Sequence, residues 1–462
     1  MFKKETYIQR RAELKKRVQS GVLLFLGNDE VGMNYADNGY TFRQDSTFLY
    51  YFGSDYAGLS AIIDIDNDKE IIFENDLTID DIVWMGTQPT AKEKAALVGI
   101  NETLPVAELK KYLDKASAKG QKIHYLPPYR GEHYVKLLHL LGIAPEAQKD
   151  GVSVEFIVAV ADMRNHKTAE EIIELEKAVD ISADMHIAAM KMARPGLKEY
   201  EVAAKIVEVA QSQGGDLSFP IIATINGQTL HNHYHGNTMQ AGQLLLIDAG
   251  AEVTSSHYCG DLSSTCPVSE RFTDQQRMIM DIQVRAHRAA VSILKPGINF
   301  RDAHVAACTS IANDMKALGL MKGDIDTAVA EGAHALFMPC GLGHMMGLDV
   351  HDMENLGEVY VGYGGKPKST VFGYKSLRLG REMEPGFVFT VEPGVYFIPE
   401  LIDLWKSEKR FAEYLNFDEI EKFKNFSGLR NEEDYLITEE GCRRLGKYVP
   451  MTPDEIEALK AQ

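Results

Sequence analysis

Two segments of the chain repeat one pattern, and this repeat limits the architectures open to the second part of the sequence. Each segment starts at a glycine, runs through residues typical of a buried strand, and reaches an acidic residue followed by a second glycine. The segments are Gly242–Gly250, with Asp248, and Gly386–Gly394, with Glu392. Two such halves indicate a pseudo-two-fold α/β unit with a site between them. Two unrelated strands entering similar turns would produce the same pattern.

The chain divides into two regions that differ in their pattern of predicted strands and helices. Up to about residue 160, short β-rich runs such as Val22–Leu26 and Leu59–Ile65 alternate with helical stretches such as Val106–Ala118, which is typical of an α/β domain. Thr168 and Glu171 then form a capping-box pattern that opens a long amphipathic helix. We therefore expect an N-terminal domain over 1–160 and a second domain over 161–462.

Charge and cysteine usage exclude several classes of function. Lys and Arg total 49 against 67 Asp and Glu, a net charge of −18, which disfavours nucleic acid as a partner. The five cysteines are scattered without a Cys-x-x-Cys pair, so we expect neither a structural zinc knot nor a disulfide framework. The first residues lack the apolar core of a signal peptide, and no run is long enough to span a bilayer. These features predict a cytoplasmic protein with no membrane partner.

Five residues in strand-like surroundings are candidates for chemistry. Four of them are carboxylates, whose convergence away from water requires a neutralising cation. A set of four carboxylates and one imidazole favours Mn(II), Fe(II) or Co(II) over a structural zinc. Two metal ions would have to share bridging carboxylates, at a separation of about 3.5–4 Å. The five residues are Asp248, Asp261, His344, Glu392 and Glu432.

Each of these residues, taken singly, has a simpler interpretation. An aspartate after a strand, like Glu392 before Pro-Gly, is usually a turn residue. His344 between glycines is compatible with an ordinary loop histidine, and Glu432 stands in an acidic run typical of a solvated surface. The five motifs together form a much more specific pattern than any of them alone.

Taken together, these motifs resemble the pita-bread metallopeptidases, the group that contains methionine aminopeptidase, aminopeptidase P and prolidase. The resemblance covers almost the whole chain. The segment FRQDSTFLYYFG (Phe42 to Gly53) is similar to the N-domain signature of aminopeptidase P and prolidase, which methionine aminopeptidase lacks. The resemblance implies an α/β (α+β) fold, with an aminopeptidase P-type N-terminal domain followed by a pita-bread catalytic domain. It also implies a homodimer.

The resemblance also assigns roles to individual residues. It implies that the five candidates hold two divalent metal ions, commonly Mn(II), with Co, Fe or Zn as alternatives, and that Glu392 also takes part in catalysis. His351 falls on the histidine that contacts the substrate carbonyl, and His231 on the histidine near the scissile bond. Creatinase shares the architecture without these ligands, so the intact set argues against it.

Three departures from the family pattern limit this transfer. Asp248 and Asp261 are two residues farther apart than is usual, but an even insertion at a hairpin tip preserves the side on which each side chain lies. Cys340 stands where a histidine often occurs, and a buried small side chain explains it better than a metal role. The segment LHNHYHGN offers His231, His233 and His235, of which His231 fits best because it follows leucine.

The expected activity is hydrolysis of the Xaa-Pro peptide bond in proline-containing di- or oligopeptides. The segment SLRLGREMEPG resembles prolidase, and Arg378 falls on the arginine that binds the carboxylate of the substrate proline. A guanidinium suits a carboxylate because it can donate two parallel hydrogen bonds. An Xaa-Pro dipeptidase is therefore preferred, with an Xaa-Pro aminopeptidase acting on longer peptides as the alternative. A non-catalytic pita-bread binding module is a third possibility, but such modules typically lose ligands.

Overall fold

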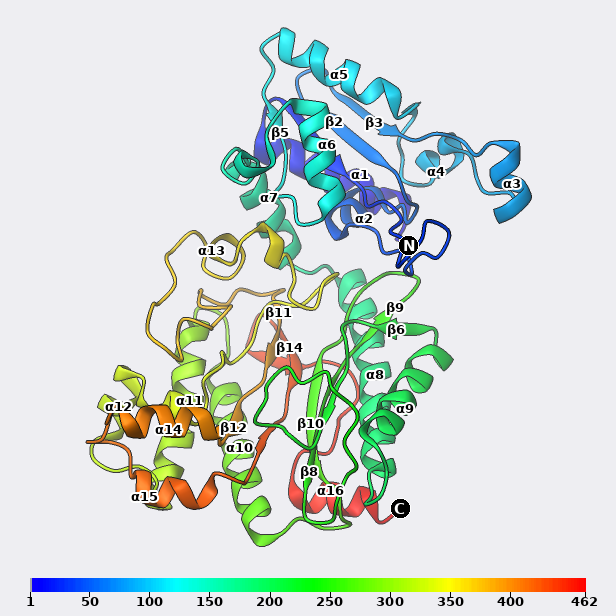
Figure 1. Ribbon diagram of the computed structural model, residues 1–462. Helices are drawn as coiled ribbons and strands as arrows, with labels where there is room; N and C mark the ends of the chain where they lie inside the picture. The colour runs from blue at the N-terminus through cyan, green and yellow to red at the C-terminus, as the bar shows by residue number, and fades with distance from the viewer. Residues whose placement is uncertain (1) are drawn as a thin grey trace. The chain divides into compact units, whose positions relative to one another are not determined.

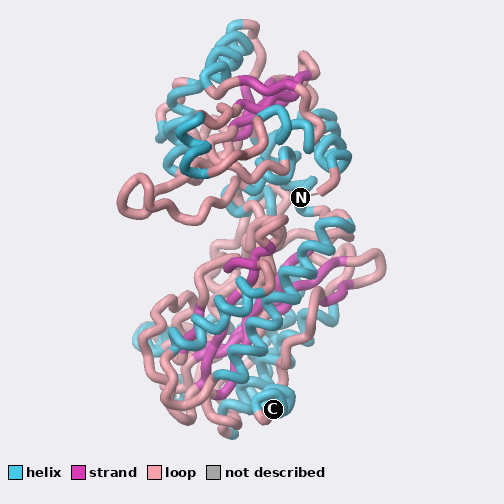
Figure 2. Tube along the Cα trace, turned by 90° about the vertical axis from the view of Figure 1, so that its right-hand side faces the viewer, coloured by secondary structure: helices cyan, strands magenta, loops and turns pink. Residues whose placement is uncertain are grey.

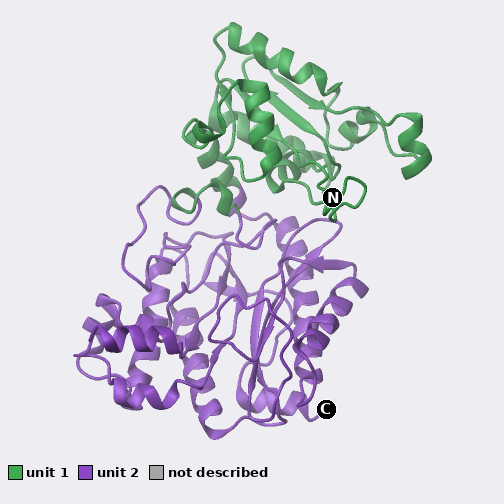
Figure 3. Ribbon diagram, in the orientation of Figure 1, with its two compact units in different colours: residues 1–163, 353–360 green, residues 164–352, 361–462 purple. Residues whose placement is uncertain are grey.

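A computed structural model describes residues 2–462, which form two compact units (Figure 3). Unit 1 comprises residues 1–163 and 353–360, and unit 2 comprises 164–352 and 361–462. Both units mix helices and strands, as Figure 2 shows. In residues 2–462, no helix combines the length and the apolar character that crossing a bilayer requires.

Unit 1 is a three-layer α/β structure built on a five-stranded sheet with the order β4-β3-β2-β1-β5 (Figure 1). β1 pairs antiparallel with β2 and parallel with β5. Its strands are β1 (Val22–Leu26), β2 (Ser60–Asp64), β3 (Lys69–Phe73), β4 (Glu102–Leu104) and β5 (Ile123–His124). Its helices are α1 (Lys4–Val18), α2 (Ser46–Phe52), α3 (Ile79–Met85), α4 (Ala91–Leu97), α5 (Ala107–Ala118), α6 (Gly131–Leu141), α7 (Val154–Asn165, which ends just beyond the unit) and the 3₁₀ turns η1 (Pro145–Ala147) and η3 (Glu354–Leu356).

Alternation along β1 explains why this sheet is covered on both faces. Val22 and Leu24 point to one face, where they share a core with Leu109 of α5 and Leu137 of α6. Phe25 points to the other face, where its ring contacts aromatic rings of α2 and α7. A strand that is apolar on both sides is the pattern expected of a buried α/β sheet.

Unit 2 carries the repeat that the sequence predicts, and each half pairs two helices with two antiparallel strands. In the first half, α8 (Ala169–Met192) and α9 (Glu199–Ser212) precede β8 (Leu244–Ala249) and β10 (Leu262–Pro267). In the second, α10 (Asp274–Ile293) and α11 (Phe300–Ala317) precede β11 (Val388–Val391) and β14 (Glu433–Ile437). The capping box at Thr168 and Glu171 is confirmed at the start of α8. The remaining elements of unit 2 are β6 (Gly215–Leu217), β7 (Ile222–Thr224), β9 (Ala251–Val253), β12 (Gly394–Tyr396), β13 (Gly428–Arg430), β15 (Cys442–Arg444), α12 (Ile325–Glu331), η2 (Ala333–Leu336), α14 (Pro399–Ser407), α15 (Phe417–Ile420), η4 (Glu421–Phe423) and α16 (Pro453–Lys460). The short helix α13 (Glu358–Val361) lies in unit 1 except for its last residue.

The two strand pairs meet at a single bridge between Ser263 of β10 and Glu432. The amide of Glu432 donates to the Ser263 carbonyl at 2.9 Å. This bridge places the start of β10 beside the start of β14, so the acidic residues of the two halves come together in one region.

Candidate metal centre

A cavity of about 640 Å³ in unit 2 is lined by every residue that the sequence singles out for chemistry. The cavity also receives Phe219, Tyr396 and Arg430, which sequence reasoning did not single out. The lining residues that were predicted are Asp248, Asp261, His344, Glu392, Glu432, His231, His351 and Arg378.

The first half of the repeat supplies two carboxylates from neighbouring strands. Asp248 is the fifth residue of β8 and lies opposite Ser263 of β10. Asp261 directly precedes β10, two residues before Ser263, so strand alternation places the Asp261 and Ser263 side chains on one face. The segment between the two aspartates is not a simple hairpin turn, because β9 leaves to pair with β6. The expected facing of the two aspartates nevertheless holds, since both line the cavity.

The second half supplies His344 and Glu392 through the pairing of a loop with β11. Thr390 of β11 donates its amide to the His344 carbonyl at 3.0 Å, and the amide of Glu392 donates to the Leu342 carbonyl at 2.7 Å. Nδ1 of His344 lies 3.1 Å from the Met345 carbonyl, which makes Nδ1 the protonated nitrogen. Nε2 is then the lone-pair nitrogen, and it lies 3.3 Å from Asp261 and 4.0 Å from Glu392.

Three of the five candidates form a tight buried cluster. One ligand atom from each of Asp261, His344 and Glu432 lies within 4.8 Å of the other two. Glu432 is 4% exposed, and its Oε2 accepts a hydrogen bond from Ser263 at 2.8 Å. Among residues 2–462, Asp261 Oδ1, Glu432 Oε1 and Asp248 Oδ1 are buried without a hydrogen-bond partner.

The electrostatics of the cluster are unfavourable without a cation. Burial, followed by repulsion from Asp248, raises the pKa of Asp261 to about 8. Burial also raises the pKa of Glu392 to about 7, although His344 opposes this shift. The pKa of Glu432 is raised well above its usual value by burial and by the neighbouring carboxylates. These carboxyl groups are costly to ionise in the interior, and several of their oxygens have no hydrogen-bond partner. Both properties fit a site that binds divalent cations.

Arg430 is the main cationic side chain that sequence reasoning missed. It is 3% exposed and forms an ion pair with Asp248. It also donates to Ser263 Oγ at 2.9 Å, to the Leu230 carbonyl at 3.2 Å and to Tyr396 Oη at 3.3 Å. The available signal was its position two residues before Glu432 at the end of β13, since strand alternation puts both side chains on one side.

The three histidines of LHNHYHGN are placed differently. His231 and His233 line the cavity, whereas His235 does not and instead contacts the Ile221 carbonyl at 3.1 Å. Burial, followed by the charge of Arg430, lowers the pKa of His231, so this imidazole is neutral. His233 also contacts the Ile221 carbonyl, through Nδ1 at 3.3 Å. The preference for His231 over His233 stays a prediction.

His351 and Arg378 both lie close to His344 of the cluster. The ring of His351 meets the ring of His344 edge-on, with centroids 4.2 Å apart. Arg378 is close enough to His344 for its charge to lower the pKa of that imidazole, after the larger effect of burial. A guanidinium and an imidazole beside four carboxylates provide groups that can hold a peptide's carboxylate and carbonyl oxygen.

Comparisons with known proteins agree on one family. Residues 174–439 match the family described as metallopeptidase family M24, and residues 7–124 match the aminopeptidase P, N-terminal domain. The chain is 32% identical to the Xaa-Pro dipeptidase of Homo sapiens, over 96% of this chain and 90% of that protein. It is 30% identical to the Xaa-Pro aminopeptidase of Escherichia coli (strain K12), over 99% and 97%.

Solved structures show the same likeness in three dimensions. The Pseudomonas aeruginosa aminopeptidase PepP superposes with a TM-score of 0.82 at 25% identity, covering 100% of this chain and 98% of that chain. A zinc-substituted E. coli aminopeptidase P in complex with product gives a TM-score of 0.81 at 27% identity, with the same coverage. The architecture is therefore that of a two-domain aminopeptidase P, with a pita-bread C-terminal domain.

Proposed function

Because the chain belongs to metallopeptidase family M24, we propose that it is a metal-dependent hydrolase of the Xaa-Pro peptide bond that releases the N-terminal residue of its substrate. The observation that carries this proposal is the single cavity in which four carboxylates and His344 meet, with buried carboxylate oxygens left unpaired. Relatives named as an Xaa-Pro dipeptidase and an Xaa-Pro aminopeptidase support the same bond specificity.

The metal ligands in this proposal are Asp248, Asp261, His344, Glu392 and Glu432, which would hold two divalent ions. When bound, such ions supply an activated water near neutral pH and a Lewis acid for the substrate carbonyl. The oxygen-rich donor set supports manganese in preference to zinc. Metal analysis of protein purified without chelators measures the number of ions bound per chain. A single ion per chain would contradict a dinuclear centre.

The remaining steps belong to the chain's own side chains. His351 donates to the carbonyl oxygen that precedes proline, where negative charge develops. Glu392 takes a proton from the attacking water at a carboxylate oxygen and delivers it to the proline nitrogen as the C–N bond breaks. This delivery matters because a tertiary amide nitrogen leaves poorly unless it is protonated. His231, held neutral by burial, lies on the cavity wall, and its proposed role is next to the scissile bond.

We propose Xaa-Pro dipeptides as the preferred substrates, because Arg378 in the cavity wall offers a partner for a free proline carboxylate. The likeness to the E. coli aminopeptidase supports the alternative, in which longer peptides are cleaved. Protein loaded with Mn(II) is assayed on Ala-Pro and on Ala-Pro-Ala. Preference for the dipeptide is expected, and preference for the tripeptide would instead support an aminopeptidase.

The role of Arg378 is tested with a neighbouring arginine as the control. Arg378→Ala should raise the KM for Ala-Pro by about 10–100-fold, since a charge-assisted hydrogen bond contributes about 1.5–3 kcal/mol. Its effect on Ala-Pro-Ala should be much smaller. Arg381, in the same segment, pairs with Glu384 and does not line the cavity, so Arg381→Ala should change neither KM. An equal loss on both substrates would remove Arg378 from the carboxylate site.

We also propose a cytoplasmic homodimer. The five reduced cysteines support a reducing compartment, and the family resemblance supports the dimer. Sedimentation velocity of the purified chain tests the second point, and a monomeric coefficient at micromolar concentration would contradict it.

A further inference from the structure

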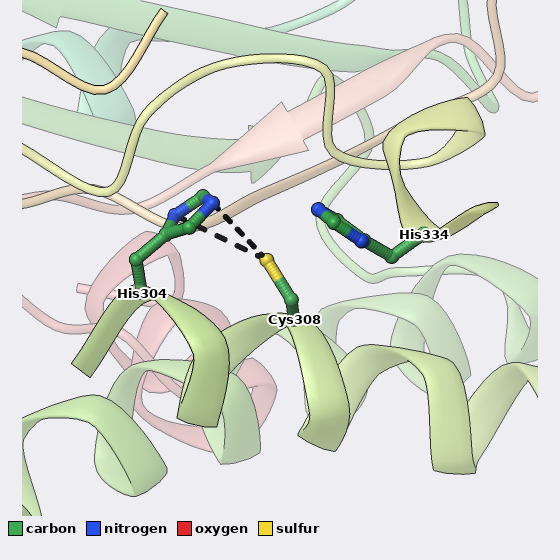
Figure 4. Close-up of side chains that lie close together, drawn as sticks. All are labelled: His304, Cys308 and His334. Carbon is green, nitrogen blue, oxygen red and sulfur yellow. Dashed lines mark hydrogen bonds between the residues drawn. The ribbon is translucent and has the colours of Figure 1, made fainter. Parts of the chain in front are cut away.

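A second group of metal-ligand side chains lies in unit 2 and uses none of the residues proposed for the peptidase centre. His304 and Cys308 stand one turn apart on α11, and His334 comes from η2. Figure 4 shows the Cys308 sulfur between the two imidazole rings. One ligand atom from each residue lies within 4.8 Å of the other two.

The polar atoms of this group have almost no partners. All three side chains are 0% exposed. Neither ring nitrogen of His334 has a hydrogen-bond partner among residues 2–462, and the hydrogen-bond contacts recorded for the His304 ring nitrogens are both with the Cys308 sulfur, at 3.6 and 4.0 Å. The faces and edges of the His304 ring contact the rings of Tyr374 and His334. A neutral imidazole carries one donor and one acceptor, and leaving such a group unpaired in the interior costs about 1–3 kcal/mol.

The nearest backbone acceptor does not relieve His334. The Val329 carbonyl acts as a hydrogen-bond acceptor that raises the pKa of His334, against the larger effect of burial, but it also accepts the Tyr374 hydroxyl at 2.8 Å and the Gly332 amide at 3.1 Å. A carbonyl oxygen has two lone pairs, and these two donors occupy both. Hydrogen bonding to this crowded acceptor therefore satisfies at most one of the two ring nitrogens of His334.

We propose that His304, Cys308 and His334 bind one copper(I) ion. A thiolate and two imidazoles form a soft ligand set, which copper(I) and zinc both accept. Structural zinc almost always takes four ligands, whereas this group offers three. An ion about 2.0–2.3 Å from each ligand would set the ligand atoms roughly 3.5–4 Å apart. His304 Nε2 and the Cys308 sulfur already lie 3.6 Å apart, and one ligand atom of His334 lies within 4.8 Å of both residues.

Charge also favours the monovalent ion. Copper(I) and one thiolate are together neutral, whereas zinc would leave a net positive charge among fully buried residues. Arg301 already places a positive charge close enough to lower the pKa of His304, after the larger effect of burial. Burial keeps both imidazoles neutral, with a pKa of about 3 for His304 and about 4 for His334, so each offers a lone pair.

Binding must replace the proton of the Cys308 thiol. Burial raises the pKa of this thiol well above its usual value, so the group is protonated without an ion. Copper(I) uptake forms the sulfur–copper bond and releases one proton per chain to solvent, with no change in oxidation state. Since all three side chains are fully buried, the ion is expected to enter as the chain folds.

The test measures copper bound to the whole chain. Protein is purified anaerobically from cells grown with copper and is then equilibrated with bathocuproine disulfonate, a chelator of copper(I). We expect one equivalent to stay bound, with sulfur and nitrogen neighbours in its X-ray absorption spectrum. Cys308→Ser should raise the copper dissociation constant by more than about 100-fold. Losing a group that only contacts a metal ligand costs about 10–100-fold, and losing a ligand itself should cost more.

Two further variants separate a metal site from simple packing. Cys266 is also a fully buried thiol, on β10 and outside the group, so Cys266→Ser should retain the copper. His334→Leu should abolish copper binding but raise the thermal midpoint of copper-free protein, because it removes two unpaired polar atoms. Wild-type protein with no more copper than Cys308→Ser, or with zinc in its place, would overturn the assignment. Mn(II)-dependent peptidase activity, unchanged in all three variants, reports correct folding.

Discussion

Individual residues of the cavity differ in how far the sequence could predict them. The motif spacing predicted that Asp248, Asp261, His344, Glu392 and Glu432 share one site, and all five line one cavity. Their role as metal ligands stays a prediction. Arg430 was missed because a sequence search for metal ligands selects carboxylates and imidazoles, and an arginine is neither. A buried countercharge is identified only when the structure shows which carboxylate it meets.

Asp261 gives the sharpest test of the proposed ligand set. Asp261→Ala removes a side chain from the buried cluster, so Mn(II) binding should fall by more than about 100-fold and hydrolysis of Ala-Pro should nearly disappear. Glu439 is an exposed acid on the turn after β14, and Glu439→Ala should leave both quantities unchanged. Metal titration and steady-state assays measure the two effects. Near-native activity in Asp261→Ala would refute the assignment.

Arg430 is expected to position Asp248 and not to touch substrate. Arg430→Lys keeps a positive charge but cannot reproduce the hydrogen bonds to Ser263, Leu230 and Tyr396. We expect Mn(II) affinity to fall by about 10–100-fold while the KM at saturating metal changes little. Arg443 pairs with Glu176 at the surface, so Arg443→Lys is the matched control. A KM effect without a metal effect would contradict a positioning role.

Helices and strands were predicted where local chemistry decides them. The capping box at Thr168 and the two repeated strands, one containing Asp248 and one directly preceding Glu392, follow from short-range pattern, and all are present. The course of the chain between Asp248 and Asp261 was not predictable. β9 is apolar at its ends like any short strand, and only the fold determines that it pairs with β6.

The junction before α8 carries a buried ion triad that we expect to be important for stability. Asp352, next to His351, lies 2.6 Å from Arg164 and 2.9 Å from Lys167, and all three side chains are buried. Asp352→Asn removes the buried negative charge that Arg164 and Lys167 share, although Arg164 keeps its ion pair with Asp349 at 3.1 Å. The loss should therefore be about 3 kcal/mol of unfolding free energy at pH 7, the low end for a broken buried pair. Urea denaturation measures this cost. Asp314→Asn, in an exposed pair with Arg285, should cost no more than about 1 kcal/mol.

The same triad predicts a pH dependence. Burial tends to raise the pKa of Asp352, but Arg164 and Lys167 outweigh it and lower the pKa below its ordinary value. A lowered native pKa contributes stability above the ordinary pKa of about 4 and loses it as the pH falls through the native value. The stability difference between wild type and Asp352→Asn should therefore shrink below about pH 4. A difference that persists in acid would contradict this account.

At the scale of the whole molecule, the sequence predicted two regions but not every residue that belongs to each. We predicted domains over 1–160 and 161–462, whereas the compact units divide after Met163 and unit 1 also contains residues 353–360. That short segment is distant in sequence from the rest of unit 1. Contacts between distant segments leave no local pattern, so composition and periodicity cannot assign it.

Bound metal should change how the thermal stability of the protein depends on pH. The pKa of Asp261 is raised to about 8 and that of Glu392 to about 7, so the native state binds protons more tightly than the unfolded state. Stability from these groups is present below about pH 4 and is lost as the pH rises through about 7 and 8. The thermal midpoint of Mn(II)-loaded protein minus that of chelated protein should therefore grow between about pH 5.5 and about pH 8.5. A constant difference would show that these carboxyls do not bind the ion.

The bridge between Ser263 and Glu432 has a consequence for how the protein is made. The proposed ligands begin at Asp248 and end at Glu432, a separation of 432 − 248 = 184 residues. At about 5–20 residues per second, a ribosome needs roughly 10–40 s to cover that distance. Throughout this interval the emerging polypeptide carries the first carboxylates without the last one. With this proposed ligand set, peptidase activity therefore arrives in one late step, after Glu432 has been added.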